Sequence, residues 1–258
     1  MLRLLAHQLR YDLLASFRNP RARFFTFILP VVLLVILAGV FGSGHTVLDG
    51  VRVDLARFYV PGILAMSVVT ASYANLVIAI TTLRESGVLK RRRATPVQPA
   101  LLVASQALTT LIITLIMAAI LLAIGKLGYG IGFSAGALAA LACAVVVGTL
   151  ACSCVGYAVS GLIRSSDAAQ PAVQLTTLPL WFISGVFVPA ADLSPTLRQI
   201  ASIFPVEHLA NACERAVVHG SFTAALAPTD LLVLAVWGAA AAVLAARRFS
   251  WLPSAAGA

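Results

Sequence analysis

The chain has 258 residues, of which 60% are hydrophobic and only 10% charged, and its formal net charge is +9. Soluble domains are about 45–50% apolar and about 25% charged, so this composition excludes an ordinary soluble fold and indicates an all-α protein integral to a membrane. The basic residues gather in short polar segments between apolar runs, which favours membrane orientation and lipid headgroups, not nucleic acid, as the reason for the charge.

Residues 1–23 carry apolar side chains at helical spacing ahead of the first long apolar run. The apolar set is Leu2, Leu5, Leu9, Leu13 and Phe17, and the polar face carries Arg3, His7, Arg10 and Arg18. An amphipathic helix of this kind lies in the headgroup plane with its charges in water. We therefore predict an interfacial helix over 1–23, interrupted at Asn19-Pro20.

Six apolar runs are candidate membrane spans within one transmembrane domain, 1–258. They cover residues 24–41, 59–83, 101–124, 135–163, 168–188 and 231–246. The first run has eighteen residues, and a helix of that length extends about 27 Å, near the thickness of the hydrocarbon core. In the fourth run small residues recur at 148, 152, 156 and 160, which is typical of a helix-packing face. The segments 42–57 and 125–134 are predicted to be outer loops.

The segment 84–99 is charged and lies between the second and third runs. It holds five of the eighteen basic residues, and each costs about 2.5–3.5 kcal/mol at the centre of a bilayer. With the amino end inside, thirteen basic residues fall on the inner side and five on the outer side. The segment is therefore predicted to be cytoplasmic, with both termini on the same side.

Polar side chains in the second and fifth spans are candidates for a substrate path. They are Tyr73, Asn75, Gln174, Thr176, Thr177 and Trp181. Neutral polar groups at this depth either bond a neighbouring helix or line a polar path, and both alternatives stay open. The fifth span also holds Pro171 and Pro179, and such helix interruptions are tolerated where a helix borders protein or a water-filled cavity.

Residues 189–228 lack a spanning run and are predicted to form two short amphipathic helices at the outer interface. Ser194-Pro195 is a typical helix start, with an N-cap serine and proline in the first turn. After Pro205, the spacing of Leu209, Cys213 and Val217 marks an apolar face opposite Glu207, Glu214 and Arg215.

Several kinds of chemistry have no motif in this sequence. No G-x-x-x-x-G-K-[ST] phosphate loop occurs, so any ATP that drives the protein must bind another chain. The four cysteines and four histidines have no metal-site spacing, so no metal site and no catalytic residue is predicted. All nine carboxylates are expected in loops or at span ends, which argues against an ion-coupled carrier. An intramembrane enzyme has still less support.

The run RESGVLK at 84–90, followed by Thr95-Pro96, is similar to the loop R-E-x-G-x-L-(K/E)…T-P of one transporter family. Pro205, His208 and Arg215 are similar to a second pattern of that family, P-x-x-(H/Y)…R. Together with the order of spans, these motifs make the whole chain resemble the permease subunits of ATP-binding-cassette exporters of the second type. The drug- and lipid-exporter branch is the most similar.

This resemblance implies a coupling helix in 84–99 that seats in a cytoplasmic ATPase. The implied contact residues are Arg84, Glu85, Gly87, Leu89, Lys90, Arg91, Arg92, Arg93, Thr95 and Pro96, and the implied outer-helix residues are Pro205, Glu207, His208 and Arg215. It also implies two ATPase copies that hold ATP and Mg, a second permease that is identical or a sibling, and a plasma-membrane location. The expected cargo is a hydrophobic or amphipathic compound moved outward, and an ion-coupled secondary transporter is the alternative.

Overall fold

A computed structural model describes residues 2–48, 50–88, 99–163 and 165–248, and it is a helical bundle. Five helical stretches are long and apolar enough to cross a membrane: Phe24–Phe41, Leu55–Glu85, Val103–Tyr129, Ala135–Ser160 and Pro228–Arg247. They correspond to the first, second, third, fourth and sixth predicted spans. The all-α membrane fold is thereby confirmed.

The second span is the central helix of the bundle. It is continuous through α4 (Leu55–Val69), the π-helical turn η2 (Thr70–Ala74) and α5 (Asn75–Glu85), and 83% of its most apolar window is buried. Its buried hydroxyls bond to the helix itself, as when Ser67 donates to the Ile63 carbonyl at 2.8 Å. Such bonds satisfy a polar group within an apolar core.

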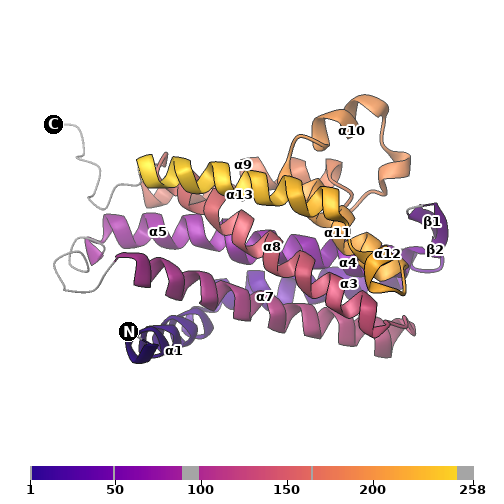
Figure 1. Ribbon diagram of the computed structural model, residues 1–258, viewed down its shortest axis with the longest axis horizontal. Coiled ribbons are helices and arrows are strands. Elements are labelled where there is room, and N and C mark those ends of the chain that lie inside the picture. Colours follow the sequence, from indigo (N-terminus) through magenta and orange to yellow (C-terminus); the bar gives the residue numbers. More distant parts are fainter. Residues whose placement is uncertain (1, 49, 89–98, 164, 249–258) are drawn as a thin grey trace.

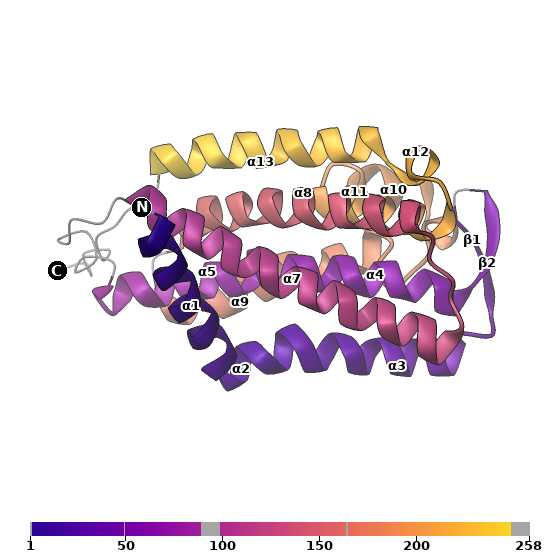
Figure 2. The ribbon, with the colours of Figure 1, turned by 60° about the horizontal axis from the view of Figure 1, so that its bottom comes forward.

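Two spans lie on the periphery of the bundle (Figure 2). The first consists of the π-helical turn η1 (Phe24–Ile28) and α3 (Leu29–Phe41), and the last is α13 (Pro228–Arg248), which packs along α8 (Ala135–Ser160). Only 22% and 17% of their apolar windows are buried. Their exposed apolar side chains therefore face lipid or another subunit.

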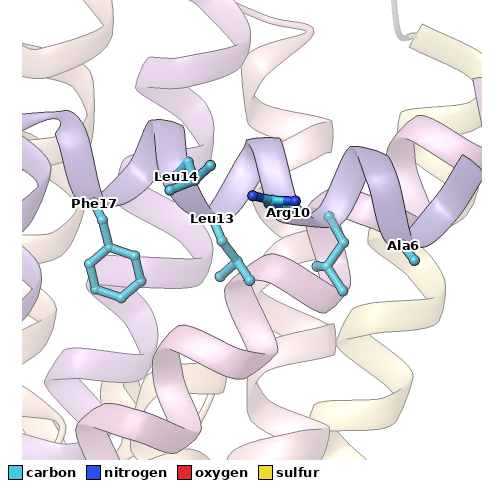
Figure 3. Close-up of a pocket in the computed structure, with 6 residues that line it drawn as sticks. Ala6, Arg10, Leu13, Leu14 and Phe17 are labelled. Carbon is cyan, nitrogen blue, oxygen red and sulfur yellow. The ribbon is translucent and has the colours of Figure 1, made fainter.

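The amino-terminal helices are α1 (Leu2–Arg18) and α2 (Pro20–Arg23), and α1 crosses the bundle beside α7 (Pro99–Tyr129) (Figure 2). One side of α1 forms a shallow apolar groove of about 380 Å³ lined by Leu9, Leu13 and Phe17, with Arg10 beside them (Figure 3). The predicted break at Asn19-Pro20 is present. The interfacial position of α1 stays a prediction.

The predicted fifth span folds as α9 (Ser166–Ile183), which is not among the five spanning candidates. Its glutamines, threonines and two internal prolines make it less apolar than the other five. It is nevertheless one continuous helix of 18 residues that packs on α5 and ends beside α11. Its membrane crossing stays a prediction.

Two predicted loops are partly regular structure. Within 42–57, β1 (His45–Leu48) and β2 (Val51–Asp54) form an antiparallel hairpin that pairs His45 with Asp54, and α4 already begins at Leu55. Within 125–134, α7 continues to Tyr129, and Gly130 then takes a positive φ of 65° that other residues rarely adopt. Helical structure thus extends beyond the apolar runs: the second span begins at Leu55 and not at residue 59, and the third ends at Tyr129 and not at residue 124.

The hairpin and the helices between spans five and six gather at one end of the bundle, opposite the ends of α1 and α5 (Figure 1). These helices are η3 (Ala190–Asp192), α10 (Pro195–Ala201), α11 (Pro205–Val218) and α12 (Phe222–Ala225). The two predicted helices are α10 and α11. However, α11 does not lie at the surface, because Leu209, Ala210 and Cys213 are fully buried against α4, α8 and α13.

The stripe of small residues on α8 is used inside the chain. A Cβ at Gly148 would overlap the Leu209 side chain of α11, and one at Gly156 would lie 2.8 Å from Leu76 Cδ2 of α5. The helix-packing face predicted for this stripe is therefore occupied by helices of the same chain. The stripe lets α11 and the central helix approach α8 closely, which is the packing role that small residues have in membranes.

Candidate substrate cavity and coupling end

A cavity of about 420 Å³ lies among seven elements of the bundle. Its walls come from α1, from η1 and the start of α3, from η2 and α5, from α7, and from α9. The lining includes Leu83 near one end of the central helix and Thr70 in its middle, a span of about 20 Å at 1.5 Å per residue. A volume of this size suits a drug-sized molecule.

Four of the six predicted path residues line the cavity: Asn75, Gln174, Thr177 and Trp181. The other two form a helix-helix bond beside it, since the Tyr73 and Thr176 hydroxyls lie 2.9 Å apart. Asn75 lines the cavity and also bonds a neighbouring element, because its Nδ2 donates to Thr26 Oγ1 of η1 at 2.7 Å. Some of these polar groups thus bond a neighbouring helix and others line the cavity, and their part in a substrate path stays a prediction.

The cavity presents side-chain amides from two facing helices. Gln106 of α7 and Gln170 and Gln174 of α9 line it and are half-buried, and their amide groups have no hydrogen-bond partner among the described residues. Each amide offers two donors and one acceptor oxygen. By contrast, the Thr177 hydroxyl donates to the Val173 carbonyl at 2.8 Å, so it can only accept a hydrogen bond from a ligand in the cavity.

One lining residue that the sequence reasoning missed is Asp12 of α1. Its Oδ2 accepts from Ser105 Oγ of α7 at 2.6 Å, and its Oδ1 accepts from Gln8 Nε2 at 2.8 Å. Asp12 therefore ties α1 to α7 at the edge of the cavity. This role has no local signal in the sequence, because the hydrogen bond joins Asp12 to a residue 93 positions away.

The end of the central helix holds the first two residues of the predicted coupling segment. Arg84 is only 4% exposed. Its guanidinium donates to the Ser160 carbonyl at 2.9 Å and to the Ile163 carbonyl, so it binds the carboxyl end of α8, where a cation also complements the helix dipole.

Glu85 makes the corresponding contact with α9. Its Oε2 accepts a hydrogen bond from the Ser166 backbone N–H at 2.7 Å, which satisfies one of the donors left open in the first helical turn. The Ser165 side chain caps the same turn by accepting from the Ala168 N–H. One carboxylate and one guanidinium thus fasten the central helix to the turn between α8 and α9.

The rest of the predicted coupling segment is only partly described. Gly87 takes a positive φ of 71° and its N–H donates to the Arg84 carbonyl at 3.1 Å, so the chain turns out of the helix there. Outside the described residues lie Leu89, Lys90, Arg91, Arg92, Arg93, Thr95 and Pro96. Their contacts with an ATPase stay a prediction.

A family model described as "ABC-2 family transporter protein" matches residues 45–247 of the chain. The chain belongs to the ABC-2 transporter family. The match covers the central helix, the predicted coupling segment, the cavity walls except α1 and η1–α3, and α13, so the sequence resemblance to permeases of this kind is confirmed. No individual curated protein matches the chain.

At the opposite end, this ABC-2 permease positions the predicted outer-helix residues around α11. Pro205 begins that helix. His208 bridges two neighbours, with Nδ1 at 2.7 Å from Asp230 Oδ1 of α13 and Nε2 at 3.0 Å from the Ser202 carbonyl, while Arg215 Nε donates to the Ala224 carbonyl at 2.9 Å. These bonds hold α11 to the segments on either side of it.

Two carboxylates of α11 are buried more deeply than a loop position would allow. Glu207 Oε2 and Glu214 Oε1 have no access to solvent and no hydrogen-bond partner among the described residues. Burial, together with a smaller contribution from the neighbouring Glu207 carboxyl, raises the pKa of Glu214 to about 8. The expectation that all nine carboxylates lie in loops or at span ends is therefore wrong for Glu214, because α11 folds into the core.

Proposed function

We propose that this ABC-2 permease exports a hydrophobic or amphipathic compound from the cytoplasm or inner leaflet, through the cavity, with energy from a separate cytoplasmic ATPase. The ATPase acts as two copies that hold ATP and Mg, and a second permease, identical or a sibling, completes the transporter. The plasma membrane holds the protein with the α1 end and both termini cytoplasmic. α1 lies in the plane of the lipid headgroups, with its apolar groove turned toward the acyl chains.

The proposal rests on one observation: the charged segment 84–99 is connected to the cavity wall through α9. Arg84 and Glu85 open the segment 84–99 and are hydrogen-bonded to the carboxyl end of α8 and the first turn of α9. The same α9 supplies Gln170, Gln174 and Trp181 to the cavity wall. A push on the segment therefore moves a cavity wall, because α9 is one helix attached at its first turn.

The neighbouring contacts favour α9 as the moving wall. α9 packs on α5 and has few contacts elsewhere in the described chain. By contrast, α4 packs against α3, α7, α8 and α11, and α8 packs against α4, α5, α7, α11 and α13. Its two internal prolines remove backbone hydrogen bonds and weaken the helix. A wall of this kind can tilt without dismantling the core.

The test is a Glu85→Ala variant with Asp167→Ala as the matched control. Both remove one carboxylate near the start of α9, but only Glu85 accepts from the Ser166 N–H. We expect Glu85→Ala to co-purify with its ATPase yet to lose most cargo-stimulated ATP hydrolysis, and Asp167→Ala to retain it. Unchanged stimulation in Glu85→Ala would remove this route of coupling.

The basic cluster Lys90–Arg93 is tested separately. Changing all four residues to Gln should weaken co-purification of the ATPase, since the cluster is proposed to make the charged contacts with it. If association persists, the cluster serves only to orient the chain in the membrane.

A further inference from the structure

The charge of the cavity lining is unbalanced. Of the residues that line it, only Asp12 carries a formal charge, and within the described chain no Lys, Arg or His is among them. The remaining walls are apolar side chains, hydroxyls and neutral amides. An isolated negative charge in a partly apolar cavity favours a positive ligand group and disfavours a negative one.

Asp12 has capacity to bind a ligand. A carboxylate has about four acceptor sites, and the described hydrogen bonds of Asp12 are one from Gln8 and one from Ser105, with the neutral Tyr157 as a further electrostatic neighbour. Neither partner is charged, and in the described part of the chain no basic side chain forms an ion pair with it. Its negative charge is held in place by two neutral donors and is not neutralised.

The position of Asp12 predicts how a ligand would be oriented in the cavity. It stands on α1 at one edge of the cavity, whereas Trp181 and the amides of Gln170 and Gln174 come from α9. A ligand with a cationic group at one end and an aromatic or hydrogen-bonding body would therefore place the cation at α1 and the body against α9.

From these observations we infer that the cavity selects monocationic amphiphiles over uncharged and anionic ones, and that Asp12 is the specificity-determining residue. This inference rests on the proposed function, since it takes the cavity to be the substrate site. The ligand class is a drug-sized molecule with one positive charge, an apolar body and several hydrogen-bonding groups. Phosphate-bearing lipids and anionic saccharides are disfavoured.

The experiment measures dye binding to the purified full-length permease in phosphatidylcholine nanodiscs by fluorescence anisotropy. Three dyes share one ring frame: rhodamine 6G is a cation, rhodamine B is a zwitterion and fluorescein is an anion. Wild type should bind rhodamine 6G most tightly and fluorescein least. Asp12→Asn should weaken rhodamine 6G about tenfold or more and leave rhodamine B within about twofold.

Two matched variants separate charge from position. Ser105→Ala removes the bond that ties Asp12 to α7 but keeps the carboxylate, so it should preserve the preference for the cation. Asp12→Glu should likewise retain it. Equal weakening of all three dyes by Asp12→Asn and by Ser105→Ala would show that Asp12 only positions α1, and the inference would be overturned.

A blocked cavity distinguishes this inference from the proposed function. Ala79 lines the cavity and its side chain is exposed, so Ala79→Trp fills the space without disturbing the core. It should abolish specific binding of rhodamine 6G. If binding is lost but Asp12→Asn leaves the dye preference unchanged, only the charge inference fails. If Ala79→Trp binds every dye as wild type does, the cavity is not the site and the proposed function fails with it.

Discussion

The two ends of the bundle hold their charged groups differently. At the end that holds α1 and the start of α9, the charges of Arg84 and Glu85 are each bonded to backbone groups of other helices. At the end that holds α11, buried oxygens of Glu207 and Glu214 have no partner in the described chain.

This difference indicates that the two ends of the bundle have different roles. A charge that is fully hydrogen-bonded fixes the relative position of two elements and can transmit force between them. A buried carboxyl without a partner destabilises its surroundings unless it takes up a proton, water or a ligand. The first end is therefore suited to coupling, and the second end is responsive to pH.

The largest effect is expected at Arg84. Arg84→Ala removes two charge-assisted hydrogen bonds and leaves the Ser160 and Ile163 carbonyls without this donor, which should lower the free energy of unfolding by about 3 kcal/mol. Thermal unfolding in detergent measures it. Arg84→Lys, which keeps the charge, should recover part of the loss. A variant as stable as wild type would show that this end is not held by its charges.

The close packing of α11 should be nearly as sensitive. Gly148→Val places side-chain atoms where Leu209 lies, and overpacking a core costs about 1–3 kcal/mol. Gly128→Ala is the control, because a Cβ there meets nothing within 4 Å. We expect a clear drop in melting temperature for the first variant and none for the second. Equal melting temperatures would contradict the internal role of the α8 stripe.

The response of the α11 end to pH is a smaller but more specific effect. Because the pKa of Glu214 is raised to about 8 in the folded chain, the folded state keeps a proton that the unfolded state loses above about pH 4.5. Stability should therefore fall as the pH rises from about 5 to 8, and level off above that range.

Glu214→Gln should flatten this part of the stability profile, since the amide does not titrate. Melting temperatures at pH 5, 6.5 and 8 for wild type and variant check it, with Asp192→Asn as a control on an exposed carboxylate outside α11. A wild-type profile that is level or rises between pH 5 and 8 would show that Glu214 is ionised in the fold.

The smallest effect is expected at the bond between the central helix and α9. Tyr73→Phe removes the hydroxyl that lies 2.9 Å from Thr176, at a cost of about 1 kcal/mol. If α9 is the moving wall, the same change should raise basal ATP hydrolysis of the assembled transporter, because α9 is freed from its neighbour. Loss of stability without a change in hydrolysis would make this bond structural only.

Much of the architecture was determined by the sequence alone. Five of the six predicted spans correspond to long helices, because about twenty consecutive apolar residues with few charges have one stable arrangement in lipid. The break at Asn19-Pro20 and the helix starts at Ser194-Pro195 and Pro205 are local backbone effects, and they appear in the structure at the predicted positions. The polar residues of α9 stand out in the sequence because a glutamine within an apolar run needs a partner or a cavity; Gln174 lines the cavity, and its role in a substrate path stays a prediction.

Only the tertiary structure decided where the charges of this bundle point. Arg84 turns inward to α8, Asp12 lines the cavity, and the Oε1 atom of Glu214 is buried when α11 folds between α4, α8 and α13. Periodicity assigned α11 an apolar face but could not show that its opposite face would also be covered. The reason is physical: the burial of a side chain depends on helices that are distant in the chain, whereas span length and turn chemistry depend on neighbouring residues.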